Sequence, residues 1–157
     1  MKKFTYTINF NYEFHAERKG AKYTVEGLHK NGGQFLEYAV KKHWGYSEDC
    51  PATAYNEGSD IPEINASVKS SKFSLACIYN DDFDSILDEY FSKVSSTLWI
   101  YVVKIDEQIA EYRMSESEFK AFVKKFGRLT RESKSDKKKI QGMATSSKMI
   151  EWFEARV

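Results

Sequence analysis

Two carboxylates and a lysine in the first half of the chain are the residue types that phosphodiester hydrolysis uses. Glu37 lies in a segment with helical spacing, Asp60 follows a polar stretch, and Lys69 comes shortly after Asp60. Carboxylate oxygens are the ligands that a hard cation such as Mg²⁺ prefers. A bound cation activates a water and neutralises charge on the phosphate, while a nearby lysine stabilises that charge. Glu37, Asp60 and Lys69 are therefore our candidate catalytic residues.

Hydrophobic periodicity predicts the elements that would position these residues. Apolar and polar side chains alternate from Phe4 to Phe14, which is typical of a half-buried strand. Residues 33–44 have apolar positions at helical spacing and are followed by Gly45, so we expect a helix that carries Glu37. The remaining short elements of this half are a turn at 17–20, a return strand at 22–25, and strands at 60–64, 66–70 and 73–79.

The second half carries stronger signals for helices and for a central strand. Asp82 or Asp84 is expected to cap an amphipathic helix. Ser115 and Glu118 have the spacing of a capping box that opens another helix. We also expect a central strand over Thr97–Ile105 with a hairpin partner over Gln108–Met114, an exposed basic loop over 128–139, and a last helix after Ser146 or Ser147.

The order of these elements resembles the core of the PD-(D/E)xK nuclease superfamily, whose restriction-endonuclease-like proteins share an αβββαβ core. A helix with Glu37, a strand that begins at Asp60, a strand that leads to Lys69 and a second helix follow one another. The resemblance covers about residues 33–105. The segment 60–75 also resembles small proteins of bacterial plasmids and phages, which implies an origin in a mobile element.

This resemblance implies roles for individual residues. Glu37 and Asp60 would bind a divalent metal, Mg²⁺ or Mn²⁺, and Lys69 would be the catalytic lysine. The superfamily has an acid two residues before that lysine, where this chain has Ser67. Glu63 could supply the missing carboxylate as a third metal ligand. Equally, the loss of the acid could mark a protein that binds DNA without cleaving it.

Basic residues near Lys69 and towards the C-terminus are candidates for phosphate contacts. The run from Lys69 to Lys72 is either an exposed strand end or a phosphate-binding segment. Residues 118–157 carry 11 basic and 5 acidic side chains, whereas the centre of the chain is acidic. With a nuclease core, the basic loop would bind phosphate and make affinity fall with salt. The predicted nucleic-acid-binding residues are Ser70, Ser71, Lys72, Arg128, Arg131, Lys137, Lys138 and Lys139.

Composition excludes several classes of protein. The chain is 41% hydrophobic and 30% charged, which is typical of a globular protein and not of a disordered one. No apolar run is long enough for a transmembrane helix, and the N-terminal segment alternates where a signal peptide would be continuously apolar. Cys50 and Cys77 have neither metal-ligand spacing nor the pattern of a disulfide framework, so we expect a protein of the reducing cytoplasm, without a membrane partner.

Together these observations predict one α/β domain (α+β, with a mixed sheet) over residues 1–157, with an N-terminal strand and C-terminal helices outside the core. The expected function is a Mg²⁺-dependent DNA endonuclease of PD-(D/E)xK type. The alternative is a non-catalytic module on the same fold that binds nucleic acid or acts as a protein-interaction or inhibitor protein. The resemblance is also compatible with a homodimer, because many proteins with this core act as dimers.

Overall fold

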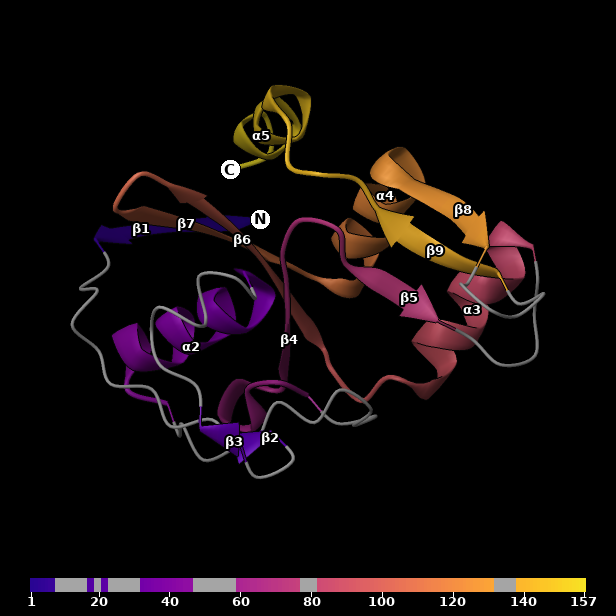
Figure 1. Cartoon of the computed structure of the whole chain (residues 1–157). Coiled ribbons are helices and arrows are strands. Elements are labelled where there is room, and N and C mark those ends of the chain that lie inside the picture. Colours follow the sequence, from indigo (N-terminus) through magenta and orange to yellow (C-terminus); the bar gives the residue numbers. More distant parts are fainter. Residues whose placement is uncertain (8–16, 19–20, 23–31, 47–58, 77–81, 132–137) are drawn as a thin grey trace.

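A four-stranded mixed sheet organises the first half of the structure and part of the second (Figure 1). Its strands are β1 (Lys2–Thr7), β4 (Ala66–Lys69), β6 (Leu98–Ile105) and β7 (Gln108–Met114), in the order β1-β7-β6-β4. β7 is antiparallel to both neighbours, whereas β4 is parallel to β6 and forms one edge. The computed structural model describes residues 1–7, 17–18, 21–22, 32–46, 59–76, 82–131 and 138–157.

Helices cover both faces of this main sheet. On one face, α2 (Gly32–Trp44) packs its apolar side against residues of β4, β6 and β7. On the other face, α3 (Phe83–Lys93), α4 (Glu116–Phe126) and α5 (Ser147–Glu154) form the larger core with the opposite side chains of β6 and β7. The alternation along β6 therefore supplies both cores, which explains why this strand reads as an almost continuous apolar run.

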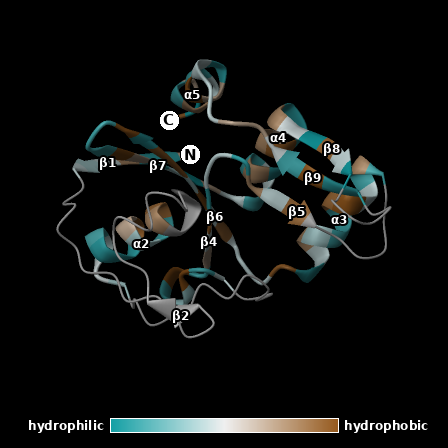
Figure 2. Ribbon diagram, in the orientation of Figure 1, coloured by the Kyte–Doolittle hydropathy of each residue, from teal (hydrophilic) through white to brown (hydrophobic). Residues whose placement is uncertain are grey.

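A second sheet lies beside α3 and α4. It contains β5 (Ser74–Ala76), β9 (Lys138–Gly142) and β8 (Gly127–Arg131), paired antiparallel in the order β5-β9-β8. Figure 2 shows hydrophilic residues interspersed along these strands, in contrast to the more apolar β6. A two-stranded ribbon, β2 (Glu17–Arg18) with β3 (Ala21–Lys22), completes the described strands.

Local signals in the sequence explain where the helices begin. The Asp82 side chain accepts a hydrogen bond from the backbone N–H of Ser85, which caps α3. Ser115 and Glu118 form the expected capping box of α4, and Ser146 caps α5. These three predicted caps are confirmed. Gly45 follows α2 with a φ of +71°, a conformation that favours glycine.

The expected strand at residues 60–64 is wrong. Pro62–Ile64 forms a 3-10 helix, and the pairing is limited to a single bridge between Ile61 and Ala66. Pro62 has no backbone N–H to donate to a ladder, which favours the tight turn over a regular strand. The strand predicted at 66–70 is present as β4, whereas β5 joins the second sheet. The described elements therefore form a mixed α/β structure without three consecutive strands in one sheet.

The prediction of an exposed basic loop over 128–139 is also wrong at both ends of that segment. Residues up to Arg131 belong to β8, and residues from Lys138 belong to β9. Long basic side chains hide the alternation of these strands, because only Leu129 and Ile140 mark the apolar face. Residues 132–137, the part of the Phe4–Phe14 strand beyond Thr7, and the end of the strand predicted at 73–79 lie outside the described residues.

The long helices and the central hairpin follow the predictions closely. The helix expected at 33–44 is α2, and the strands expected at Thr97–Ile105 and Gln108–Met114 are β6 and β7. Among the helices that the structure describes, none has the length and apolar character needed to cross a membrane.

Candidate functional site

Glu37 and Asp60 both lie near the β4 edge of the main sheet. Glu37 lies near the middle of α2, which packs against β4, and Asp60 directly precedes the residue that bridges to β4. Burial raises the pKa of Glu37 above its ordinary value, and the negative charge of Asp60 raises it further. The structure thus places Glu37 and Asp60 within electrostatic range of each other.

The position of Asp60 depends on a hydrogen bond to the edge strand. Its Oδ2 atom accepts the backbone N–H of Val68 at 2.7 Å. On the same edge, Ile61 and Ala66 exchange two backbone hydrogen bonds of 3.0 and 3.1 Å. The carboxylate of Asp60 therefore continues the pairing of β4 where the strand partner ends, and this contact fixes the side chain.

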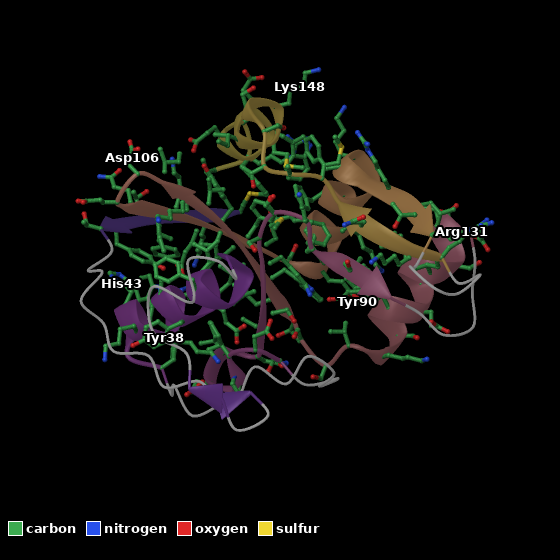
Figure 3. All side chains as sticks on the ribbon, viewed as in Figure 1. Tyr38, His43, Tyr90, Asp106, Arg131 and Lys148 are labelled. Carbon is green, nitrogen blue, oxygen red and sulfur yellow. The ribbon has the colours of Figure 1, made fainter. Side chains whose placement is uncertain are left out.

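Lys69 lies at the end of β4 and approaches the site from the other face of the sheet. Val68 packs with the α2 core, so alternation directs Ser67 and Lys69 to the opposite side. There Lys69 Nζ lies 5.8 Å from the ring centroid of Tyr90 on α3, and Figure 3 shows Tyr90 between α3 and the main sheet. The Lys69 charge is nevertheless close enough to lower the pKa of Glu37.

A second lysine, Lys41, completes the charge arrangement. Lys41 is 3% exposed, and its Nζ lies 3.1 Å from Oε1 of Glu37, one helical turn earlier. This ion pair opposes the effect of burial on the pKa of Glu37. The i,i+4 spacing was visible in the sequence, but such pairs are common on exposed helix faces and burial of this one was not predictable. Two carboxylates thus lie among two ammonium groups.

The third metal ligand implied by the resemblance does not join this pair. Ser67 is buried, and its hydroxyl shares a 2.7 Å hydrogen bond with that of Ser96. Glu63 is exposed on the 3-10 helix. Among the residues that the structure describes, no three His, Cys, Asp or Glu side chains form a group that could hold a metal. Glu37, Asp60 and Glu63 therefore do not form a three-carboxylate cluster in this conformation.

The predicted phosphate-binding residues are divided between several places. Lys72 and Arg128, far apart in sequence, line one pocket of about 310 Å³ at the second sheet. Ser71 lies in the turn directly before Lys72, and its Oγ accepts a hydrogen bond from the backbone N–H of Thr145 at 3.2 Å. The carbonyl of Ser70 accepts the N–H of Phe73 in the same turn. Lys139 pairs with Thr130, Lys138 pairs with Arg131, and Lys137 lies outside the described residues.

A buried acid that the sequence did not single out lies at the C-terminal end of α2. Glu111 on β7 is fully buried and accepts hydrogen bonds from Trp44 Nε1 at 3.0 Å and from the Tyr6 hydroxyl at 3.1 Å. The guanidinium group of Arg113 lies 3.4 Å from Oε2 of Glu111, and the Tyr6 ring stacks on His43. An isolated glutamate in a strand gives no sequence signal of such a network, which here joins α2 to β1 and β7.

Comparison with known proteins adds no relative: no protein-family model, curated protein or solved structure matches the chain.

Proposed function

We propose that this chain is a metal-dependent DNA nuclease of PD-(D/E)xK type, with Glu37 and Asp60 as ligands of Mg²⁺ or Mn²⁺ and Lys69 as the catalytic lysine. The observation that carries the proposal is the electrostatic interaction of Glu37 with Asp60, which is held at the β4 edge by Val68, with the charge of Lys69 also in range. Two neighbouring carboxylates offer hard oxygen ligands, and a cation there would activate water and neutralise charge on a phosphate.

The electrostatics of the pair favour a cation. Asp60 raises the pKa of Glu37 because two negative charges close together repel, and a divalent ion relieves that repulsion. Lys41 now provides part of this compensation through its contact with Glu37. We expect the Lys41 ammonium group to move away from Glu37 when a divalent cation binds, leaving Lys69 to stabilise charge on the phosphate.

The decisive assay incubates purified protein with plasmid DNA and single-stranded DNA in Mg²⁺, in Mn²⁺ and in EDTA. Asp60→Asn is the preferred variant because asparagine keeps an oxygen that can accept the Val68 N–H, while the negative charge is lost. We expect metal-dependent cleavage by the parent protein, and a loss of at least about a hundredfold in Asp60→Asn. Lys69→Gln should lose cleavage as well.

The matched control is Asp88→Asn, which makes the same change at an exposed position of α3. This variant should cleave like the parent protein, and circular dichroism should show that all variants are folded. Cleavage retained in both Asp60→Asn and Lys69→Gln would overturn the assignment of these residues.

One observation favours a second candidate, a module that binds DNA without cleaving it. The position of the superfamily's third acid is occupied by Ser67, and its hydroxyl is bonded to Ser96 and thereby turned away from the carboxylate pair. In addition, Lys41 and Lys69 already oppose the effect of Asp60 on Glu37 without a metal ion. This candidate predicts DNA binding that is unchanged by divalent metal, with no cleavage under any of the conditions above.

A further inference from the structure

We propose that the pocket between Lys72 and Arg128 on the second sheet binds a backbone phosphate of the DNA strand, an inference that rests on the proposed function for the identity of its ligand. The pocket measures about 310 Å³ and is lined by Lys72, Arg128, Thr130, Gln141, Gly142, Met143 and Ala144. Two cations, a hydroxyl and an amide are groups that phosphate oxygens accept hydrogen bonds from, and none of the described lining residues is acidic.

The register of the second sheet explains why these side chains gather on one face. Leu75, Ile140 and Leu129 are aligned across the three strands, and the first two are fully buried in the core. Alternation then directs Arg128, Thr130 and Gln141 to the opposite face. This face lies opposite the core residues Leu75 and Ile140, and both Arg128 and Lys72 are exposed.

The same register separates the basic residues into two groups. Lys139 is aligned with Thr130 and extends the basic face beyond the pocket. Arg131 is aligned with Lys138, and this pair falls on the side of Leu129, at the far end of the sheet in Figure 3. Arg128 and Arg131 therefore have the same charge and lie on the same strand, but only Arg128 lines the pocket.

An unused hydroxyl supports a ligand in this pocket. The Oγ1 atom of Thr130 is buried, and among the described residues it has no hydrogen-bond partner. A buried hydroxyl without a partner is costly, and a phosphate oxygen would accept a hydrogen bond from it. Thr130 lines the same pocket as Lys72 and Arg128, so a phosphate that displaces the atoms covering this hydroxyl would add a third contact.

A short connection fixes the pocket relative to the carboxylate site. Lys69 is the last residue of β4, and Lys72 follows after two residues in a turn. The backbone N–H of Lys72 donates to the carbonyl of Met143 at 3.4 Å. Lys72 has a φ of +61°, which belongs to this tight turn. A DNA strand bound in the pocket would therefore be held at a fixed distance from Lys69. The pocket would thus determine which phosphate of that DNA strand lies at the carboxylate site.

The test measures binding without cleavage. Fluorescence anisotropy with a short fluorescein-labelled single-stranded oligonucleotide, in EDTA, compares the parent protein with Arg128→Gln, Lys72→Gln and Arg131→Gln. We expect each pocket variant to weaken binding about tenfold and to reduce the salt slope by about one. Arg131→Gln and a second control, Lys42→Gln at an exposed position of α2, should have smaller effects.

Equal effects of Arg128→Gln and Arg131→Gln would overturn the pocket, because they would indicate a diffuse charge effect. Absence of binding by the parent protein would overturn it as well. The two proposals fail separately: weakened binding in Arg128→Gln together with full cleavage by Asp60→Asn would leave the pocket and remove the nuclease site. Unchanged binding in both pocket variants, with cleavage lost in Asp60→Asn, would remove the pocket and leave the nuclease site.

Discussion

At the scale of single residues, the site consists of four charged side chains that interact electrostatically near the β4 edge: Glu37, Asp60, Lys41 and Lys69. Burial and Asp60 raise the pKa of Glu37, and Lys41 and Lys69 lower it. Three of these four residues were predictable, because the types Glu, Asp and Lys in that order resemble a nuclease motif. Lys41 was not predictable, since its importance comes from the burial of its side chain on α2 and not from its spacing.

The raised pKa of Glu37 predicts a pH dependence of stability. An acid whose pKa is higher in the folded than in the unfolded state holds its proton more tightly when folded. Its contribution to stability is therefore present at low pH and falls as pH rises from the ordinary value towards the folded one. In Asp60→Asn the repulsion is absent, so the pKa of Glu37 and the associated loss of stability should both decrease.

Carboxyl NMR titration measures this pKa directly, and urea unfolding across the same pH range measures the stability. Asp88→Asn, an exposed position, serves as the control and should leave the Glu37 titration unchanged. A Glu37 pKa that does not move in Asp60→Asn would show that the two carboxylates do not interact.

At the scale of elements, the helices and the central hairpin were predictable because their signals are local. Caps at Asp82, Ser115 and Ser146 and the apolar run of β6 depend on a few neighbouring residues. The second sheet was not predictable for two reasons. About 50 residues separate β5 from β8 in the sequence, and long basic side chains obscure the alternation within β8 and β9. The strand prediction at residues 60–64 was wrong for a different reason, because Pro62 favours a 3-10 helix over strand pairing.

Packing between β9 and the turn before β5 gives a prediction at this scale. A Cβ atom at Gly142 would overlap the ring of Phe73, and the N–H of Gly142 bonds to the carbonyl of Phe73 at 2.7 Å. Because the Phe73 side chain is buried, Gly142→Ala should destabilise the protein by about 1–3 kcal/mol. Urea unfolding of the variant measures this loss.

Phe73→Leu supplies the second arm of a double-mutant cycle. In that background Gly142→Ala should cost clearly less, since the overlapping ring is absent. Ser74→Ala, an exposed change on adjacent β5, should alter stability by less than about 0.5 kcal/mol. Additive effects of Gly142→Ala and Phe73→Leu would contradict this account of the contact.

At the scale of the whole molecule, function depends on how the chain joins distant segments. β1 pairs with β7, which follows it by about a hundred residues, and β4 pairs with β6 across α3. The connection after β4 then carries the chain from the main sheet into the second sheet, from Lys69 to Lys72. Periodicity predicts the elements but not these long-range pairings, so the sequence indicated the basic residues without showing which of them share a face.

The central claim is that Glu37 and Asp60 form a divalent-cation site, and Mn²⁺ binding tests it most directly. Calorimetric titration of the full chain with Mn²⁺ should show one site, and Asp60→Asn should lose it while Asp88→Asn retains it. The Mn²⁺ affinity should fall at low pH, because protonated Glu37 cannot bind the ion. Absence of Mn²⁺ binding, or equal binding by Asp60→Asn and the parent protein, would contradict the claim.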